Sequence, residues 1–333
     1  MNSSSPVVSI VMPLYNAERF VFAALKSVLS MQDLPLEVIV VDDGSTDRSI
    51  AEVERLQDQR VHVVSNSGKG IADALNTGLA IAQGEIIARC DADDLYPAHR
   101  LSSQVQWLSD HPEFAAVCGN YLAIDPKGKL VIQFNCGETE EEITEELRAG
   151  ISRTHLCTFA IRTQALREVG GFRAYFTSAE DVDLQLRLGD RFRVGYLPEI
   201  CYQYRLHNAS ITHTRSSRER EFFDGIAREF QQQRQLSGKD NLQRGCPPPL
   251  PSPGKAAFTA AEHIQGFLLS RAWQEFQQGQ KRQAFFTGVQ AALTYPQNFS
   301  VWRSLLALWV KSVVKAMNYK ALLFKQRFAL NRE

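Results

Sequence analysis

Short apolar runs alternate with segments of helical spacing along the first part of the chain. The runs 7–13, 37–41, 61–64 and 85–90 are mostly apolar and rich in valine and isoleucine, which is typical of buried strands. Between these runs, apolar residues recur every three or four positions, as on one face of a helix. Because strands and helices alternate over short connections, the pattern predicts an α/β fold with a mostly parallel sheet covered by helices on both sides.

Polar residues stand where these helices are predicted to begin. Asn16 and Ser45 are the predicted N-caps of the first two helices. The third helix is predicted over 71–82 and ends before Gly84, and a fourth follows over 98–110.

The second half of the chain has a less regular pattern. A strand at 114–118 leads to a predicted hairpin turn at 125–128, and the acidic segment 138–146 is predicted to form an exposed helix. A loop at 170–172 precedes a predicted helix over 179–188. We expect some antiparallel strands in this part.

The character of the sequence changes again toward the C-terminus. A charged, glutamine-rich helix is predicted over 215–236, and a proline-rich linker follows at 246–254. Three further helices are predicted at about 256–278, 281–294 and 298–328.

Carboxylates directly follow two of the predicted strands. Asp42 and Asp43 follow the second strand, and Asp91 and Asp93 follow the fourth. The carboxyl ends of parallel strands share one edge of a sheet, so these side chains can line one crevice. Neighbouring carboxylates repel each other unless a cation lies between them, and oxygen ligands suit Mg²⁺ or Mn²⁺. The alternative is a solvated acidic turn that caps the following segment.

Other charged residues near the predicted strand ends complete this picture. Glu180 and Asp181 open a predicted helix, where the positive end of the helix dipole favours an ionised carboxylate suited to a general base. Arg89 and Arg100 flank the acidic loop, and we expect them to pair with its carboxylates.

Composition excludes several classes of protein. The 333 residues contain 37 basic and 37 acidic side chains, so the net charge of zero gives no indication of a nucleic-acid partner. Six cysteines occur without a Cys-x-x-Cys spacing, which argues against structural zinc and for free thiols in a reducing compartment. The N-terminal residues lack a cationic leader pattern and no apolar run is long enough to span a bilayer, so we expect a cytoplasmic protein.

Seven stretches within about residues 6–213 form an ordered set. They are Val8–Asn16, Val40–Asp47, Ala72–Gly78, Asp91–Asp94, Gly170–Phe172, Glu180–Leu184 and Tyr204–His207. In this order they resemble the motifs of the inverting family 2 glycosyltransferases, which have the GT-A fold. No Gln-x-x-Arg-Trp motif follows Asp181, so the chain resembles the non-processive bacterial members of the family rather than a processive synthase.

The resemblance implies a binding site for a nucleotide-diphospho-sugar donor, with a UDP-sugar favoured. Asp43 matches the aspartate that hydrogen-bonds the base, and Asp93 is the closer match to a direct metal ligand. His207 matches a histidine that completes the metal site in some members, with Mn²⁺ or Mg²⁺ as the cofactor. The implied nucleotide-sugar-binding residues are Pro13, Tyr15, Asn16, Asp42, Asp43, Lys69, Asp91 and Ala92, and the implied metal ligands are Asp91, Asp93 and His207.

The resemblance also implies the catalytic groups and the mechanism. Asp181 matches the catalytic base, and Glu180 lies beside it near the acceptor. A single in-line displacement at the anomeric carbon would invert the configuration of the sugar. His155 precedes an apolar strand and is either an acceptor contact or a structural histidine.

Five regions follow from the pattern and the resemblance together. Residues 1–110 are the expected nucleotide-sugar-binding half of the GT-A domain, and 111–214 are the expected acceptor-binding half. A charged helix at 215–245, a proline-rich linker at 246–255 and a helical C-terminal region at 256–333 complete the chain.

The acceptor and the cellular location follow less directly. A saccharide or lipid-linked saccharide acceptor is expected, in surface polysaccharide or other glycoconjugate synthesis. The predicted helix 298–328 is rich in aliphatic residues, tryptophan and cations, so it either contacts the inner face of the cytoplasmic membrane or packs on neighbouring protein. The alternatives to a transferase are a sugar nucleotidylyltransferase and an inactive nucleotide-sugar-binding protein of the same fold.

Overall fold

The computed structural model describes most of the chain in two units. The described residues are 6–31, 34–210, 216–251 and 259–305. Among them, the first unit comprises 6–31, 34–124, 133–205 and 216–251, and the second unit comprises 125–132, 206–210 and 259–305.

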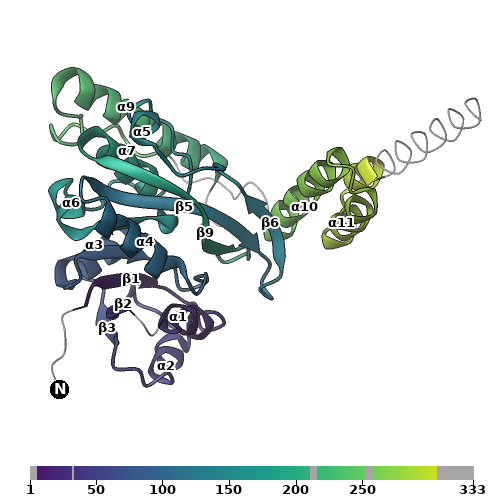
Figure 1. Ribbon diagram of the computed structural model, residues 1–333, viewed down its shortest axis with the longest axis horizontal. Helices are drawn as coiled ribbons and strands as arrows, with labels where there is room; N and C mark the ends of the chain where they lie inside the picture. The colour runs from purple at the N-terminus through teal and green to yellow at the C-terminus, as the bar shows by residue number, and fades with distance from the viewer. Residues whose placement is uncertain (1–5, 32–33, 211–215, 252–258, 306–333) are drawn as a thin grey trace, which may run out of the picture. The chain divides into compact units, whose positions relative to one another are not determined.

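Four parallel strands form one half of the sheet, as predicted. They are β1 (Val8–Leu14), β2 (Leu36–Asp42), β3 (Val61–Ser65) and β4 (Ile86–Arg89). Their order is β3-β2-β1-β4, so the chain first builds outward from β1 and then crosses to the other side of it (Figure 1). Such a switch in direction opens a crevice at the carboxyl ends of the strands, where open α/β sheets bind ligands.

The other half of the sheet is mixed. β8 (Ala160–Arg162) runs antiparallel between β4 and β5 (Phe114–Ile124), and β9 (Arg193–Arg205) is parallel to β5. The short β7 (Glu141–Glu142) is antiparallel to β9, and β6 (Leu130–Phe134) pairs with β5. The pairing of β5 with β6 confirms the predicted hairpin at 125–128. The predicted antiparallel strands are also confirmed.

Helices cover both faces of the sheet because side chains alternate along each strand. Ile10 of β1 packs with α1 (Val21–Leu29) and α4 (Arg100–Asp110), whereas the adjacent Val11 packs with α3 (Ile71–Ile81). The strands are therefore buried on both sides, which explains why their sequences are continuously apolar.

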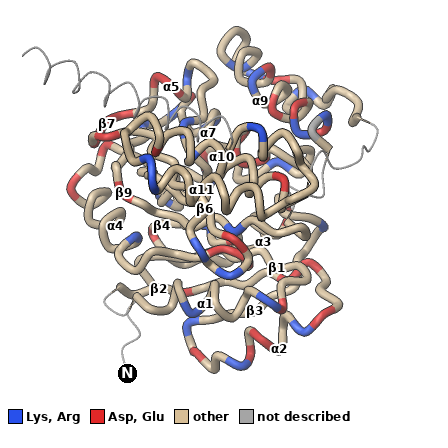
Figure 2. Tube along the Cα trace, turned by 90° about the vertical axis from the view of Figure 1, so that its right-hand side faces the viewer, with Lys and Arg blue, Asp and Glu red and all other residues tan. Residues whose placement is uncertain are grey.

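The first unit contains further helices, of which α9 (Ser217–Ser237) is the longest. The long helix α9 confirms the predicted charged, glutamine-rich helix, and Figure 2 shows both signs of charge along it. These elements are α2 (Ser49–Glu54), α5 (Thr144–Arg148), the 3₁₀ helix η1 (Leu156–Thr158), α6 (Thr163–Glu168), α7 (Glu180–Arg191) and α9 (Ser217–Ser237).

The two predicted N-caps are wrong. The helix α1 begins at Val21, and Asn16 has a left-handed backbone with φ of 48° and accepts a hydrogen bond from the Thr46 amide at 2.8 Å. The helix α2 begins at Ser49, and the Ser45 hydroxyl accepts the Asn16 amide instead, at 3.1 Å. Both polar side chains connect two loops, because each loop extends further past its strand than the sequence pattern indicated.

The acidic segment 138–146 does not form the predicted exposed helix. The segment contains the short strand β7 and the start of the helix α5 (Thr144–Arg148), and two arginines pair with its carboxylates. Arg153 pairs with Glu141 at 2.6 Å, and Arg193 on β9 pairs with Glu142 at 2.7 Å. Both glutamates are exposed, and their ion pairs are with arginines from other segments, which the local sequence pattern does not record.

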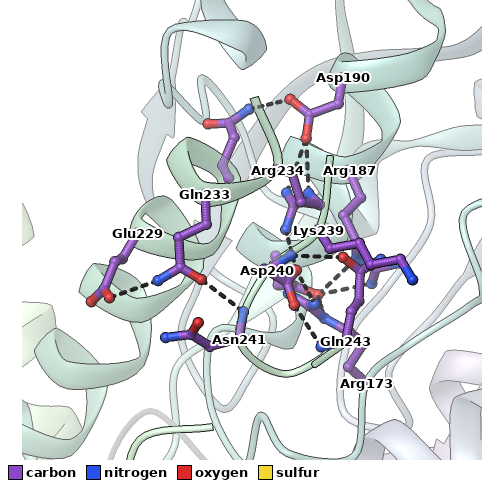
Figure 3. A network of polar contacts seen from close by, with 12 residues as sticks. Arg173, Arg187, Asp190, Glu229, Gln233, Arg234, Lys239, Asp240, Asn241 and Gln243 are labelled. Atoms are coloured by element: carbon purple, nitrogen blue, oxygen red, sulfur yellow. Dashed lines mark hydrogen bonds and ion pairs between the residues drawn. The ribbon is translucent and has the colours of Figure 1, made fainter. Parts of the chain in front are cut away.

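A buried ionic network holds α7 against α9 and the turn that follows it (Figure 3). Asp183 on α7 and Asp240 after α9 are fully buried, and Arg173 donates to both of them. Arg187 also pairs with Asp183, and Arg234 on α9 pairs with Asp240, each at 2.8 Å. Because an unpaired buried charge is costly, every member depends on the others.

The second unit contains a helical hairpin. α10 (Ala260–Gln277) opens with a capping box formed by Thr259 and Glu262, and α11 (Lys281–Thr294) follows after Gly279, which has a φ of 84°. These helices confirm two of the three predicted C-terminal helices.

The third predicted C-terminal helix is only partly described. Residues 299–305 are helical, and the rest of the predicted segment 298–328 lies outside the described residues. Within the part of the chain that is described, no helix combines the length and the apolar character needed to cross a bilayer.

Candidate active site

The loops after β1 and β2 are fastened together at the carboxyl edge of the sheet. Asn16 of the first loop is hydrogen-bonded to Ser45 and Thr46 of the second loop. Within the second loop, the Asp42 carboxylate accepts a hydrogen bond from the Ser45 amide at 3.1 Å. The ring of Tyr15 is 62 % exposed at the tip of the first loop, directly after Pro13 and Leu14 of β1. An exposed ring on a fixed loop is suited to packing against a planar ligand.

Asp43 is oriented by the loop that follows β3. Its carboxylate accepts hydrogen bonds from the Asn66 side chain at 2.7 Å and from the Gly70 amide at 2.9 Å. The left-handed backbone of Gly70, with φ of 84°, turns that amide toward the carboxylate. The Lys69 side chain is exposed beside this turn, while its amide donates to Asp73 at 2.9 Å.

Arg89 connects the loop after β4 with the start of α7. Its guanidinium donates to both oxygens of Asp91, at 2.6 and 2.9 Å, and to Glu180 at 3.1 Å. Arg89 and Glu180 are 9 % and 7 % exposed, so the pairing takes place in the interior. The expected pairing of Arg89 with the acidic loop is confirmed. Arg89 also pairs with Glu180, which lies 91 positions away in the chain.

The acidic loop after β4 is anchored by the last residues of β9. The Asp91 amide donates to the Tyr202 hydroxyl at 3.0 Å, and the Asp94 carboxylate accepts the Arg205 amide at 2.6 Å. The Arg205 guanidinium also donates to the Asp93 carbonyl at 2.6 Å. Burial, followed by the charges of Asp93 and Asp91, raises the pKa of Asp94 well above its usual range.

Arg100 does not pair with the acidic loop as expected. Its side chain is fully buried, with the guanidinium 4.0 Å from the centroid of the Tyr96 ring. Its polar contacts are to the Gln104 side chain and the Phe159 carbonyl, both at 3.1 Å. The helical register of α4 directs Arg100 into the core rather than toward the loop.

The start of α7 brings two carboxylates to the same edge of the sheet. Ala179, just before the helix, has a left-handed backbone with φ of 57°, a conformation that costs a non-glycine residue about 1–3 kcal/mol. This turn leads directly into Glu180 and Asp181, whose carboxylate accepts the Val182 amide at 2.9 Å. Strained backbone of this kind is often found next to functional groups.

The surroundings of these carboxylates shift their protonation. Burial raises the pKa of Asp181 above its ordinary value, although Arg89 lowers it in part and Asp91 raises it further. Burial likewise raises the pKa of Glu180, opposed by Arg89 and reinforced by Asp181. The protonation of Glu180 affects that of Asp181 and the reverse, because the two carboxylates are neighbours. A carboxylate with a raised pKa is a stronger base when it is ionised.

The structure brings some of the predicted site residues together and leaves others apart. Arg89 joins Asp91 to Glu180, and Asp181 follows next in the chain. Asp43 lies in a separate hydrogen-bonded loop pair after β2 and β3. Ala92 is buried within the acidic loop, and His207 belongs to the second unit. The roles of these residues stay predictions.

Two of the groups that organise the acidic loop were not among the predicted site residues. Tyr202 and Arg205 on β9 fix the acidic loop, yet nothing in their local sequence distinguishes them from ordinary strand residues. The Tyr204–His207 stretch, which includes Arg205, was the only signal near them.

The fit of a divalent cation rests on the oxygen donors of the acidic loop. Among the described residues, no group of three or more histidine, cysteine, aspartate or glutamate side chains is arranged to hold a metal ion. Both oxygens of Asp91 accept hydrogen bonds from Arg89, and the half-buried Asp93 is a second carboxylate of the same loop. This set fits a cation held by one or two carboxylates and completed by substrate phosphates, as is usual for Mg²⁺.

Comparison with known proteins identifies the family. The model of glycosyl transferase family 2 matches residues 9–179, which is about half of the chain. The chain therefore belongs to glycosyl transferase family 2, and both the predicted family and the predicted α/β fold are confirmed.

Several curated relatives share this region. The chain is 28% identical over 221 residues to a protein named chondroitin synthase from Pasteurella multocida, covering 65% of this chain and 22% of that protein. It is 32% identical over 212 residues to the putative glycosyltransferase EpsE of Bacillus subtilis, covering 61% of this chain and 74% of that protein. The chain thus spans less than a quarter of the length of the first of these relatives.

A solved structure has a similar fold. The structure of Staphylococcus aureus TarS residues 1–349 in complex with UDP-GlcNAc superimposes with a TM-score of 0.58 at 21% identity. The match covers 86% of this chain and 81% of that chain.

Proposed function

We propose that this chain transfers a sugar from a nucleoside-diphosphate sugar to a hydroxyl group of a saccharide acceptor, with inversion at the anomeric carbon. The observation that carries the proposal is the Arg89 bridge between Asp91 and Glu180 at the carboxyl edge of the sheet. This bridge supports the proposal because Asp181, a carboxylate with a raised pKa, follows Glu180 directly in the chain.

The donor is a nucleoside-diphosphate sugar, and a uridine nucleotide is favoured. Asp43 offers a carboxylate oriented by Asn66 and Gly70, which can accept the N–H of a uracil ring. Tyr15 offers an exposed ring at the same edge. The similar fold of TarS, which was solved with UDP-GlcNAc, supports this donor class.

The reaction needs Mn²⁺ or Mg²⁺ in this proposal. Asp93 would hold the cation, and Asp91 orders the same loop. When bound, the cation supplies positive charge where the departing diphosphate develops negative charge.

The residues of the chain then carry out one displacement. The Asp181 carboxylate accepts the proton of the acceptor hydroxyl while that oxygen forms a bond to the anomeric carbon. The bond from this carbon to the phosphate oxygen breaks, and the nucleoside diphosphate leaves. Arg89 keeps the Glu180 and Asp91 carboxylates in place, and Glu180 contacts the acceptor beside the base. One displacement inverts the configuration.

The names of several relatives support a place in polysaccharide synthesis. Chondroitin synthase and hyaluronan synthase of Pasteurella multocida share this region with the chain, at 28% and 30% identity. We infer that the acceptor is a saccharide, either free or linked to a lipid. Contact with the inner face of the cytoplasmic membrane through 298–328 remains a prediction, and vesicle binding of the full chain with and without these residues would measure it.

Calorimetric titration tests the donor site. UDP, GDP and dTDP are titrated into the wild type and into Asp93→Ala, each with and without Mn²⁺. We expect UDP to bind in a metal-dependent manner, and we expect Asp93→Ala to lose this dependence. Absence of binding by all three nucleotides would favour the inactive-protein alternative and contradict the proposal.

A further inference from the structure

Four aromatic side chains form a continuous row in the acceptor half of the first unit. The Tyr121 and Phe134 rings are stacked with their centroids 4.5 Å apart, and the His155 ring meets Tyr121 edge-on at 4.6 Å. The His155 ring is in turn stacked with Tyr204 at 5.8 Å. These residues, the aromatic row, come from β5, β6, the turn before η1 and β9.

The aromatic row lies at the surface rather than in the core. His155 is exposed, and the other three rings are half-buried. By contrast, the neighbouring core aromatics Phe159 and Tyr202 are each 1 % exposed. Contiguous partly exposed rings of this kind are a common feature of ligand sites.

One end of the aromatic row lies next to the proposed reaction centre. Tyr204 directly precedes Arg205, which holds the Asp93 and Asp94 loop. His155 directly precedes η1, which contacts both β4 and α7. The Cys157 thiol of η1 lies 3.8 Å from the Asp91 carboxylate, so the row begins beside the group that Arg89 orders.

The charge state of His155 suits a neutral ligand. Loss of hydration and, to a smaller extent, the positive charge of Arg89 lower the pKa of His155 to about 4, against an opposing effect of Asp91. At neutral pH the imidazole is therefore uncharged, and its nitrogens can donate and accept hydrogen bonds with hydroxyl groups.

We propose that the aromatic row is the acceptor subsite, and that successive sugar rings of the acceptor pack their C–H faces on it. The inference rests on the proposed function, because it assigns the partner of the donor site. A sugar ring has one face lined by C–H groups, and burying that face on an aromatic ring removes apolar surface from water. Four contiguous rings fit an acceptor of at least two sugars better than a single sugar.

The competing explanation is purely structural. Aromatic pairs across neighbouring strands stabilise hairpins such as β5–β6, by about 0.2–1 kcal/mol per pair. Under that explanation, truncating a ring lowers the stability of the protein and leaves the binding of saccharides unchanged. The two explanations therefore differ in a measurable way.

Saturation-transfer NMR on the full chain tests the proposal. The probes are methyl glycosides of glucose, galactose, glucuronic acid and the N-acetylated amino sugars, together with disaccharides of the same units, in the presence of UDP and Mn²⁺. We expect saturation of C–H protons for at least one disaccharide, with weaker signals for the matching monosaccharide. We expect His155→Ala and Tyr204→Ala to weaken that signal at least fivefold, and Tyr204→Phe to retain it.

Controls separate the possible failures. Phe286→Ala removes an aromatic ring in the second unit that is 70 % exposed, and it should leave the saccharide signals unchanged. Thermal melting and UDP titration of each variant report on folding and on the donor site. If the wild type binds UDP but no saccharide, or if the row variants bind saccharides normally, the aromatic row is not the acceptor subsite. If the wild type does not bind UDP, the proposed function itself fails.

Discussion

The two halves of the sheet hold their candidate site residues in different ways. In the parallel half, Asp43 is oriented by Asn66 and Gly70, which belong to the next loop along the chain. In the mixed half, Glu180 and its neighbour Asp181 depend on Arg89, which lies 91 positions from Glu180. The first site is built by loops whose contacts are 23 to 27 positions apart, and the second by a contact between residues 91 positions apart.

This difference determines how far a change spreads. The donor loops are attached to a sheet that is buried on both faces, so a substitution in them should affect one ligand contact. The helix α7 is held by Arg89 at its start and by the network of Asp183, Arg173 and Asp240 further along. A substitution in that network should affect both stability and the position of Asp181.

The largest expected effect is on the base itself. Asp181→Asn removes the proton acceptor, so transfer should fall by about 10²–10⁴-fold, the usual contribution of general base catalysis. The affinity for UDP should be unchanged, because the donor loops do not depend on this carboxylate. Parallel assays of transfer and of UDP binding measure the two effects, and an equal loss in both would contradict the base role.

The buried network gives the next largest effect. Asp240→Asn removes a buried charge that pairs with Arg173 and Arg234. Because Arg173 keeps Asp183 and Arg234 keeps Asp190 as partners, we expect a loss of about 1–3 kcal/mol of unfolding free energy. The matched control is Asp224→Asn on α9, where Asp224 is solvent-accessible and pairs with Arg228. Urea denaturation of both variants makes the comparison, and equal stability would contradict the role of the network.

The same residue predicts the pH dependence of stability. Burial alone would raise the pKa of Asp240, but hydrogen bonds from Gln243, Arg173 and Arg234 outweigh it and lower the pKa. Its stabilising effect is therefore present above the unfolded-state pKa of about 3.9 and is lost as the pH falls through the folded-state value. Urea denaturation of the wild type should show an unfolding free energy that decreases below about pH 4. This decrease with falling pH should be smaller in Asp240→Asn.

Substitution of Asp43 should have a smaller and more local effect. Removing a hydrogen bond to a charged acceptor costs about 1.5–3 kcal/mol, so Asp43→Ala should bind UDP about tenfold to a hundredfold more weakly. Glu54→Ala is the control, because Glu54 is exposed on α2, belongs to no predicted site and should change the affinity less. Calorimetry measures both, and thermal melting should show little change for either variant.

The smallest expected effect concerns the acid side of the pH–activity profile. Arg89 lowers the pKa of both Asp181 and Glu180, so Arg89→Met should raise these pKa values. Activity needs the ionised base, and its loss on acidification should therefore begin about one pH unit higher in the variant. Arg48→Met is a control on an exposed arginine. An unchanged acid limb in Arg89→Met would show that Arg89 does not act on the base.

Much of the parallel half could be predicted because its determinants are local. The apolar runs of β1, β2 and β4, and the helical spacing of α3, follow directly from burial on both faces. The N-caps at Asn16 and Ser45 could not be predicted, because their partners lie in loops about thirty residues away. The prediction for the acidic segment 138–146 was wrong for the same reason, since its glutamates pair with Arg153 and Arg193 from other segments.

The sequence by itself determined the order of the strands and helices in the parallel half, the carboxylates at strand ends and the family. Those features depend on spacing within a few residues. Only the tertiary structure decided that Arg89 joins Asp91 to Glu180, that Arg100 is buried, and that His155 stacks on Tyr204. Such contacts depend on the packing of segments that are far apart in the chain, and no local pattern of residues records which of them will meet.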